Sequence, residues 1–309
     1  NNKVFGVVIL LVAIMAILSD RFLTEANIFN VLRQVAITAI VAVGFTFIIA
    51  AKEIDLSIGS VVGFVGVVVG GLTVYYNVPL YIAVIVGILI GAISGAVNAT
   101  IISIFNLPAF IVTLATQSLF RGVIYIITEM APVVNIPNEL VYIGQGYLGP
   151  VPVPVVIMFF MYILFWYISK KTTFGRYVVA KGGNTEAAYL CGINIRIVRM
   201  IVFVLGGVCA AIGAIVLTGR TASAQVSAGV GIEFDCVIGV VIGGTAFTGG
   251  VINVMGTLFG CLIVGIINNG LNLLGVDSNY QIIAKGFMIL LALAIDIITT
   301  GFFAKRKNK

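Results

Sequence analysis

The chain is a succession of long apolar runs, and these constrain its fold more than any single motif does. Residues 80–102, for example, contain no charged side chain. A bilayer core of about 30 Å requires about 20 mainly apolar residues per helical span. Transmembrane β-strands would instead alternate in polarity over about ten residues, whereas these runs are longer and apolar on every side. With only 9% charged residues, the sequence predicts an all-α membrane protein.

About ten such runs are separated by short stretches rich in Gly, Pro, Asn or Lys. The predicted spans are residues 4–18, 28–50, 54–74, 80–102, 106–128, 150–169, 196–218, 231–247, 251–273 and 280–303. The first run continues into "SDRFLTEAN" without a small-residue cleavage site, so we interpret it as a short first span rather than a signal peptide.

The distribution of Lys and Arg predicts which loops face the cytoplasm. If the N-terminus is inside, the inner segments hold Lys3, Lys52, Lys170, Lys171, Arg176, Lys181, Arg196, Arg199, Lys305, Arg306, Lys307 and Lys309. The outer segments hold only Arg21 and Arg220. The positive-inside rule then predicts a multi-pass protein with both termini cytoplasmic. The net charge of +6 indicates topology and attraction to anionic lipid, and no nucleic-acid partner is predicted.

A faint internal repeat indicates two halves. "GILIGAISGAVN" (87–98) aligns with "GTLFGCLIVGII" (256–267), and "IDLSIGSVVG" (54–63) aligns less regularly with "EFDCVIGVVIGG" (233–244). These segments are five predicted spans apart, so the two halves would have inverted topology, as in many transporters. We predict a single permease domain with halves at approximately 28–128 and 196–303. Glycines spaced four apart also favour close helix packing in lipid, which alone would explain part of the similarity.

Uncharged polar residues inside the spans are candidates for a translocation pathway, because each is costly in hydrocarbon unless it faces a neighbour or water. A lining of amides suits a neutral, hydroxyl-rich solute. The alternative is that these residues form hydrogen bonds between helices, and for each single residue this explanation is slightly favoured. The pathway candidates are Asn98, Gln117, Asn268, Asn269 and Asn272.

Two carboxylates stand at the start of predicted spans. Asp55 lies in "KEIDLSIGS" and Asp235 in "GIEFDCVIG", and each is suited to a helix N-cap or first turn. The alternative is that one of them couples transport to protons. Arg121, Lys285 and Asp296 also lie near or inside spans, and the sequence does not pair them.

The sequence lacks the residues that several kinds of catalysis require. The chain has no histidine and no GxxxxGK[ST] phosphate loop, so neither ATP hydrolysis nor the usual nucleophilic or metal catalysis is predicted within it. Cys191, Cys209, Cys236 and Cys261 are isolated, and we expect reduced, packed thiols without a metal site or disulfide. We predict no catalytic residue, no metal ligand and no cofactor bound to this chain, which disfavours an intramembrane enzyme.

The basic loop at 170–195 interrupts the apolar pattern. In "GGNTEAAYLCGI" (182–193), Asn184 or Thr185 can cap a helix, Glu186 suits its first turn, and Gly192 can end it. The sequence therefore predicts about two turns of helix in this loop. A helix so short is marginal alone, so we expect it to pack against something else.

The residues "EAAYLCG" (186–192) fit the EAA, three residues, G motif of permease subunits in ATP-binding-cassette importers. The wider sequence resembles the ribose-type carbohydrate permeases, through "EIDLSIGS", "NLPAFIVTLAT" and "RGVIYIIT" in the first half and "FGRYVVAKGGN", "TASAQVSAGVGIEFD", "VIGGTAFTGG", "GTLFGCLIVGIINNGLNLLGV" and "NYQIIAKGFMILLALAID" in the second. The resemblance covers nearly the whole chain. It departs at Lys52 and Glu53, where an uncharged glycine is expected before "IDLS".

The resemblance implies a ten-helix permease of the type II, cobalamin-importer-like class in a bacterial inner membrane. The implied partners are a nucleotide-binding ATPase subunit that holds ATP and Mg, an extracytoplasmic sugar-binding protein, and a second permease chain, identical or paralogous. The implied ATPase-coupling residues are Gly182, Gly183, Asn184, Thr185, Glu186, Ala187, Ala188 and Gly192.

The implied solute is ribose, with another pentose or hexose, inositol or autoinducer-2 as alternatives. A second class of function stays open at this point. An ion-gradient-driven transporter or channel would use Asp55 or Asp235 as its coupling site and would need no ATPase.

Overall fold

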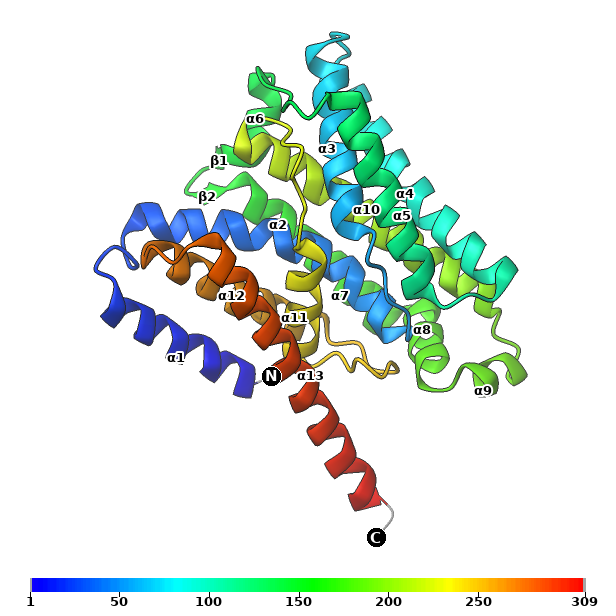
Figure 1. Ribbon diagram of the computed structural model, residues 1–309. Helices are drawn as coiled ribbons and strands as arrows, with labels where there is room; N and C mark the ends of the chain where they lie inside the picture. Colours follow the sequence, from blue (N-terminus) through cyan, green and yellow to red (C-terminus); the bar gives the residue numbers. More distant parts are fainter. Residues whose placement is uncertain (1, 308–309) are drawn as a thin grey trace.

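The computed structural model in Figure 1 describes the backbone of residues 2–307 and the side chains of residues 4–277 and 279–294. Each of the ten predicted spans overlaps a helix. These are α1 (Asn2–Leu18), α2 (Glu25–Ala50), α3 (Ile58–Val74), α4 (Leu80–Phe105), α5 (Ala109–Thr128), α7 (Val153–Lys171), α10 (Ile195–Thr221), α11 (Ile232–Ile242), α12 (Val254–Leu273) and α13 (Ser278–Lys307). The described chain is thus mostly helical, which agrees with the prediction of a helical membrane protein.

Three shorter helices and a small hairpin lie between these elements. They are α6 (Asn138–Gln145), β1 (Tyr147–Leu148), β2 (Val151–Pro152), α8 (Thr173–Gly183) and α9 (Thr185–Leu190). The two strands pair antiparallel, with Tyr147 opposite Pro152. In Figure 1, α6 and the hairpin lie at one end of the bundle, and α8 and α9 lie at the other. The short helix predicted at 184–192 is therefore present as α9, whereas α6 and α8 were not predicted.

Six helices of the described chain are long and apolar enough to cross a membrane: α2, α4, α5, α7, α10 and α12. Helices α1, α3 and α13 contain shorter apolar stretches. The prediction of a span over 231–247 is wrong in extent, because α11 has 11 residues and is only about 16 Å long. It ends where glycines start a loop, since Gly244, Gly249 and Gly250 all have positive φ. The count of ten spans stays a prediction.

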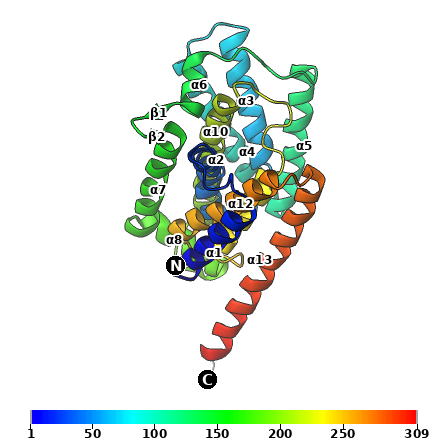
Figure 2. The ribbon, with the colours of Figure 1, turned by 90° about the vertical axis from the view of Figure 1, so that its left-hand side faces the viewer.

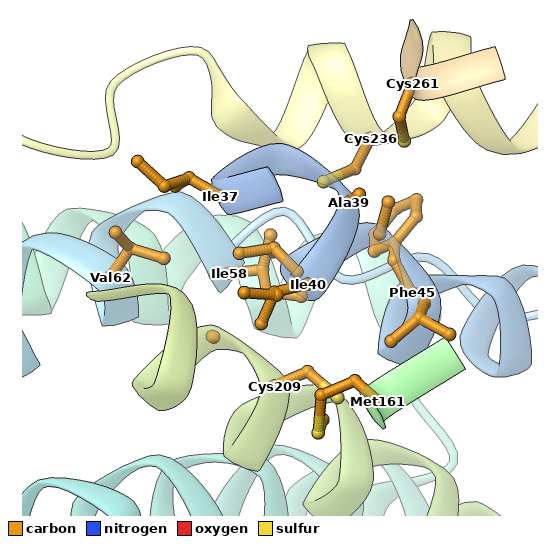
Figure 3. Packing of buried hydrophobic residues seen from close by; sticks show 14 of the residues in the cluster. Ile37, Ala39, Ile40, Phe45, Ile58, Val62, Met161, Cys209, Cys236 and Cys261 are labelled. Carbon is orange, nitrogen blue, oxygen red and sulfur yellow. The ribbon is translucent and has the colours of Figure 1, made fainter. Parts of the chain in front are cut away.

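Helix α2 is the centre of the hydrophobic core. From Val35 to Ala50 nearly every side chain is buried, so this helix is enclosed by protein on all sides. Figure 3 shows Ile37, Ile40 and Phe45 of α2 between residues of the helices around it. Its neighbours in that view include Ile58 of α3, Met161 of α7, Cys209 of α10, Cys236 of α11 and Cys261 of α12.

The outer surfaces of α4, α5 and α7 are apolar. On α4, Ile85, Leu89 and Ile93 are exposed at four-residue spacing, so they lie on one face of the helix. A continuous exposed apolar surface of this kind is foreign to a water-soluble monomer. It indicates contact with lipid or with another membrane-embedded chain.

Glycines bring α4 and α10 into backbone contact. A Cβ atom on Gly91 would overlap the Gly207 carbonyl oxygen, and one on Gly95 would overlap the Phe203 carbonyl oxygen. Likewise, a Cβ on Gly260 of α12 would overlap the Gly239 carbonyl oxygen of α11. The predicted packing role of these glycines is thus seen directly, because only glycine permits such approach.

Helix contacts recur in the two halves of the chain. Helix α10 packs on α4 and α3, and α2 correspondingly packs on α12 and α11. The pairs α3 with α4 and α3 with α5 have counterparts in α11 with α12 and α11 with α13. Figures 1 and 2 show the C-terminal part of α13 extending beyond the other helices. The repeated contacts support the two-half interpretation, whose boundaries and inverted topology stay predictions.

Candidate functional site

The α8–α9 unit forms the predicted coupling segment. Asn184 caps α9, because its Oδ1 accepts a hydrogen bond from the Ala187 backbone N–H at 2.9 Å. Glu186 lies in the first turn, where the helix dipole favours a carboxylate. Gly192 has φ 82°, and the Ile193 N–H bonds the Ala188 carbonyl at 3.1 Å, which together make a Schellman end. The local structure expected for this segment is confirmed.

One face of α9 is open and the other is packed. Ala188 is buried, whereas Ala187 and Glu186 are exposed. Tyr189 and Leu190 are 69% and 79% exposed. Two large apolar side chains thus stand free on a helix outside the spans. Cys191, the next residue, is also exposed, which corrects the expectation that all four thiols are packed; all four cysteines are free thiols, and the other three are buried.

Helix α8 is anchored tightly to the loops beside it. A Cβ on Gly182 would overlap the Ala50 carbonyl oxygen and come within 2.5 Å of the Gly250 nitrogen. The Gly250 N–H in turn donates to the Ala50 carbonyl at 2.9 Å. The end of α8, the end of α2 and the 243–253 loop therefore meet backbone to backbone, and Gly182 is needed for that approach.

A buried cluster of charged side chains also holds α8 against the linker after α2. The Glu53 carboxylate accepts from Lys181 Nζ at 2.8 Å and from Arg199 Nε at 2.7 Å. Lys181 Nζ also donates to the Ala51 carbonyl at 2.7 Å. Lys181 is 2% exposed and Glu53 8%. Burial lowers the pKa of Lys181, an effect that the neighbouring Glu53 carboxylate opposes. We call Glu53, Lys181 and Arg199 the charge cluster.

The two residues that depart from the family pattern are both explained by this arrangement. Glu53 is the common acceptor of the charge cluster. Lys52 is exposed and has φ 62°, a left-handed conformation that favours glycine. The expected glycine at this point would therefore fit the backbone without strain.

A chain of polar side chains runs inward from the 51–57 linker. The Asp55 carboxylate accepts from the Ser57 N–H at 2.9 Å and from the Ser57 hydroxyl. Asn98 Nδ2 donates to Ser57 Oγ at 2.9 Å, and Thr116 Oγ1 donates to Asn98 Oδ1 at 2.7 Å. The linker is thereby joined to α4 and α5. Asp55 precedes α3 by three residues, so it does not cap that helix, whose N-cap is Ser57.

Gln117 belongs to a second polar group, between α5 and α11. Its Nε2 donates to Glu233 Oε1 at 3.1 Å. Arg121 lies one turn further along α5 and donates to the Val226 and Gly59 carbonyls at 3.3 Å. Glu233 is buried, and among the described residues no side-chain partner other than Gln117 hydrogen-bonds its carboxylate. The sequence reasoning missed Glu233, although it stands two residues before Asp235 in the same apolar run.

The asparagines of α12 make contacts elsewhere. Asn269 and Asn27 exchange two amide hydrogen bonds of 2.9 and 3.1 Å. Asn272 is exposed and accepts from Gln281 Nε2 at 2.8 Å. Asn268 is buried. None of these contacts involves Asn98 or Gln117, so within the described residues the five pathway candidates do not form one hydrogen-bonded network, and their role stays a prediction.

Asp235 lies in the first turn of α11, as its sequence position suggested. Its carboxylate is 2.9 Å from Lys285 Nζ of α13. Lys285, unpaired in the sequence reasoning, thus has a partner, while the side chain of Asp296 lies outside the described residues. In the described part of the chain, no three His, Cys, Asp or Glu residues cluster in a way that could hold a metal ion.

Comparison with known proteins relates the chain to a family of permeases. A family described as "Branched-chain amino acid transport system / permease component" matches residues 27–293. The chain is 40% identical to the ribose import permease protein RbsC of Haemophilus influenzae over 96% of this chain and 93% of that protein. It is 42% identical to RbsC of Bacillus subtilis over 93% and 89%.

A further relative, the D-allose transport system permease protein AlsC of Escherichia coli, is 34% identical over 94% of this chain and 90% of that protein. No solved structure matches the chain. The family match runs from α2 into α13, and this range contains the charge cluster, the polar chain and α9. The chain belongs to the family of permease components described for the branched-chain amino acid transport system.

Proposed function

We propose that this chain is the membrane-spanning permease subunit of an ATP-driven sugar importer, with ribose as its solute. The observation that carries the proposal is the similarity of about 40% identity, over nearly the whole length of both proteins, to permeases named for ribose import. The family description refers to branched-chain amino acids, but several relatives that match nearly the whole chain are named for ribose or D-allose.

The α8–α9 unit supports coupling to a separate ATPase. An exposed helix with two free apolar side chains, Tyr189 and Leu190, is suited to enter a groove on another protein. Helix α8 carries such a contact to the 51–57 linker through Gly182 and the charge cluster. The polar chain from Asp55 to Thr116 continues it into α4 and α5. Movement of α9 would therefore be passed to α4 and α5 through these contacts.

In the proposed assembly, two permease chains surround one pathway in a bacterial inner membrane. Each has ten membrane-embedded helices of the type II class and both termini in the cytoplasm. A sugar-binding protein delivers the solute from outside, and two ATPase subunits, which hold ATP and Mg, dock at α9. ATP binding closes the ATPases, moves α9, and switches the pathway between outward and inward access.

Reconstitution tests this function. The full chain is purified from its native membrane with the subunits that co-purify, placed in liposomes, and supplied with a ribose-binding protein and labelled ribose. We expect uptake that requires ATP on the ATPase side and that unlabelled ribose, but not leucine, suppresses. Leucine uptake would instead favour the solute in the family description.

Gradient-driven transport is the rival class. Asp55 and Asp235, its candidate coupling carboxylates, already have partners in Ser57 and Lys285, which disfavours it. Uptake by the purified chain alone, driven by a proton or sodium gradient and independent of any ATPase, would overturn the proposal.

A further inference from the structure

Two adjoining cavities open beside α9. The first, of about 410 Å³, lies between the 52–54 linker, the α4–α5 turn at 106–110, α8 and α10. The second, of about 690 Å³, lies between the end of α4, α9 and the start of α10. Both are lined by Asn106, Thr185 and Arg199, so they form one depression, which we call the α9 groove.

The groove has an excess of positive charge. Its ionisable lining consists of four cations and one carboxylate: Lys52, Lys181, Arg196, Arg199 and Glu53. The Glu53 carboxylate already forms ion pairs with Lys181 and Arg199. Glu186 is not among the lining residues. An anion that entered the groove would therefore be attracted by cations that no carboxylate in the lining neutralises. At physiological salt this attraction acts over a Debye length of about 8 Å.

Several donors in the groove are unused. Among the described residues, neither the Lys52 ammonium nor the Arg196 guanidinium has a hydrogen-bond or ion-pair partner, and both are exposed. Arg199 uses Nε for Glu53 and Nη1 for Ser103, which leaves its Nη2 free. Lys52 lines the first cavity. These groups can donate to a carboxylate in the charge-assisted manner that proteins favour.

We propose that the α9 groove receives a carboxylate-bearing segment of the ATPase subunit while α9 itself docks on that subunit. The proposal rests on the proposed function and adds the chemistry of the partner: acidic side chains that face Lys52, Arg196 and Arg199. Docking would then consist of two adjacent contacts, an apolar one through Tyr189 and Leu190 and an ionic one through the groove.

The position of the groove favours a protein over a lipid headgroup. Its wider part lies against α9 and the α9–α10 connection, with Thr185, Asn194 and Gly192 in the lining. These residues are polar or small and exposed, and they belong to the segment outside the predicted spans. A protein that engages Tyr189 from the solvent side lies directly over this opening.

Charge reversal in the α9 groove tests whether its cations contribute to binding of the ATPase. Binding of the co-purifying ATPase to the full chain in nanodiscs is compared for three proteins: wild type, Lys52→Glu with Arg196→Glu, and a matched control. The control, Lys170→Glu with Lys171→Glu, reverses two exposed cations outside the groove lining. We expect the double reversal to weaken binding about tenfold at low salt, because like charges then meet across the interface. The difference should vanish near 1 M salt, where the Debye length is about 3 Å, and the control should bind like wild type.

Zero-length crosslinking tests the contact itself. A carbodiimide joins an ammonium to a carboxylate in direct contact, so Lys52 should form an amide with an Asp or Glu of the ATPase. Lys52→Arg keeps the charge but removes the reactive amine, and should abolish the crosslink while preserving binding. The intrachain pair of Lys181 and Glu53, 2.8 Å apart, supplies an internal comparison.

The outcomes separate the two proposals. Binding that survives the double reversal, or crosslinks only at Lys171, would overturn the groove assignment while the coupling function of α9 stands. A charge-reversal effect that disappears in nanodiscs without anionic lipid would assign the groove to lipid headgroups. Failure of the ATPase to bind any variant, including wild type, would instead contradict the proposed function.

Discussion

Glu53 Oε1 accepts a hydrogen bond from Lys181 Nζ at 2.8 Å, although 128 residues separate the two in the chain. The contact ties the α2–α3 linker to α8, and Arg199 of α10 joins it at the same carboxylate oxygen. Three segments from distant parts of the sequence thus share one acceptor. Because Lys181 is almost fully buried, the pair is a fixed connection rather than a surface contact.

Removal of the shared carboxylate should destabilise the protein. In Glu53→Ala two cations lose their acceptor, and a buried charge without a partner costs about 3–5 kcal/mol. Glu53→Ala with Lys181→Ala should recover much of that loss, since the buried ammonium is gone as well. Thermal unfolding in detergent measures both, with the exposed Glu139→Ala as control. Strictly additive effects would show that the two residues do not interact.

Lys52→Gly should raise stability, whereas Lys52→Ala should not. The left-handed backbone at position 52 costs an L-residue about 1–2 kcal/mol, and glycine avoids that cost at the expense of some chain entropy. A net gain of about 0.5–1 kcal/mol is expected. An equal change in melting temperature for both variants would mean that the side chain, not the backbone, decides the effect.

Bulky substitution on α9 should separate docking from folding. Ala187 is exposed and Ala188 is buried, so Ala187→Trp should abolish ATPase binding and uptake without lowering the melting temperature. Ala188→Trp should lower the melting temperature, because overpacking typically costs about 1–3 kcal/mol. Glu186→Lys should reduce ATPase binding in the same way as Ala187→Trp. Unchanged pull-down and transport in both exposed-face variants would contradict the docking role.

Cys191 should be the thiol that reacts with a membrane-impermeant maleimide. It is exposed at the end of α9, whereas Cys209, Cys236 and Cys261 are buried. Mass spectrometry of the labelled full chain should find one modified cysteine, and Cys191→Ser should remove it. Prior binding of the ATPase should slow the labelling several-fold, and labelling that is indifferent to the ATPase would place the docking surface elsewhere.

Asn98 and Gln117 should behave differently when truncated. Asn98 is fully buried and bonded to Ser57 and Thr116, so Asn98→Ala should cost about 1–3 kcal/mol by stranding those partners. Gln117 is half-buried with a single bond to Glu233, and Gln117→Ala should alter the apparent affinity of uptake more than the melting temperature. The reverse pattern would place the solute beside Asn98.

The helices were predictable because their apolar runs are long and the residues between the runs disfavour helix. Proline precedes both α4 and α5, and between them Asn106 takes a left-handed conformation ahead of Pro108. Helix α9 was predictable for the same reason, since its cap and its terminal glycine are local signals. Helix α8 was not, because "TFGRYVVAKGG" has glycines within it and is held by packing at Gly175 and Gly182.

The site was less predictable than the fold. Lys52 and Glu53 were visible only as departures from a family pattern, and no local signal indicates that Glu53 meets Lys181. Glu233 and Asp235 are two residues apart on a helix, so they face different neighbours: Gln117 on α5 and Lys285 on α13. Such pairings depend on how helices are placed in space, which one sequence read along its length does not specify.

The glycine contact between α4 and α10 has a mechanical consequence. Where backbones touch through Gly91, Gly95 and Gly207, there is no side chain to rearrange, so a helix from each predicted half is clamped to the other. Helix α5 also makes hydrogen bonds to other segments through the side chains of Thr113, Thr116, Gln117 and Arg121. Water or a passing hydroxyl can replace such bonds at little cost. We therefore expect the contacts of α5 to open more readily than the backbone contact between α4 and α10.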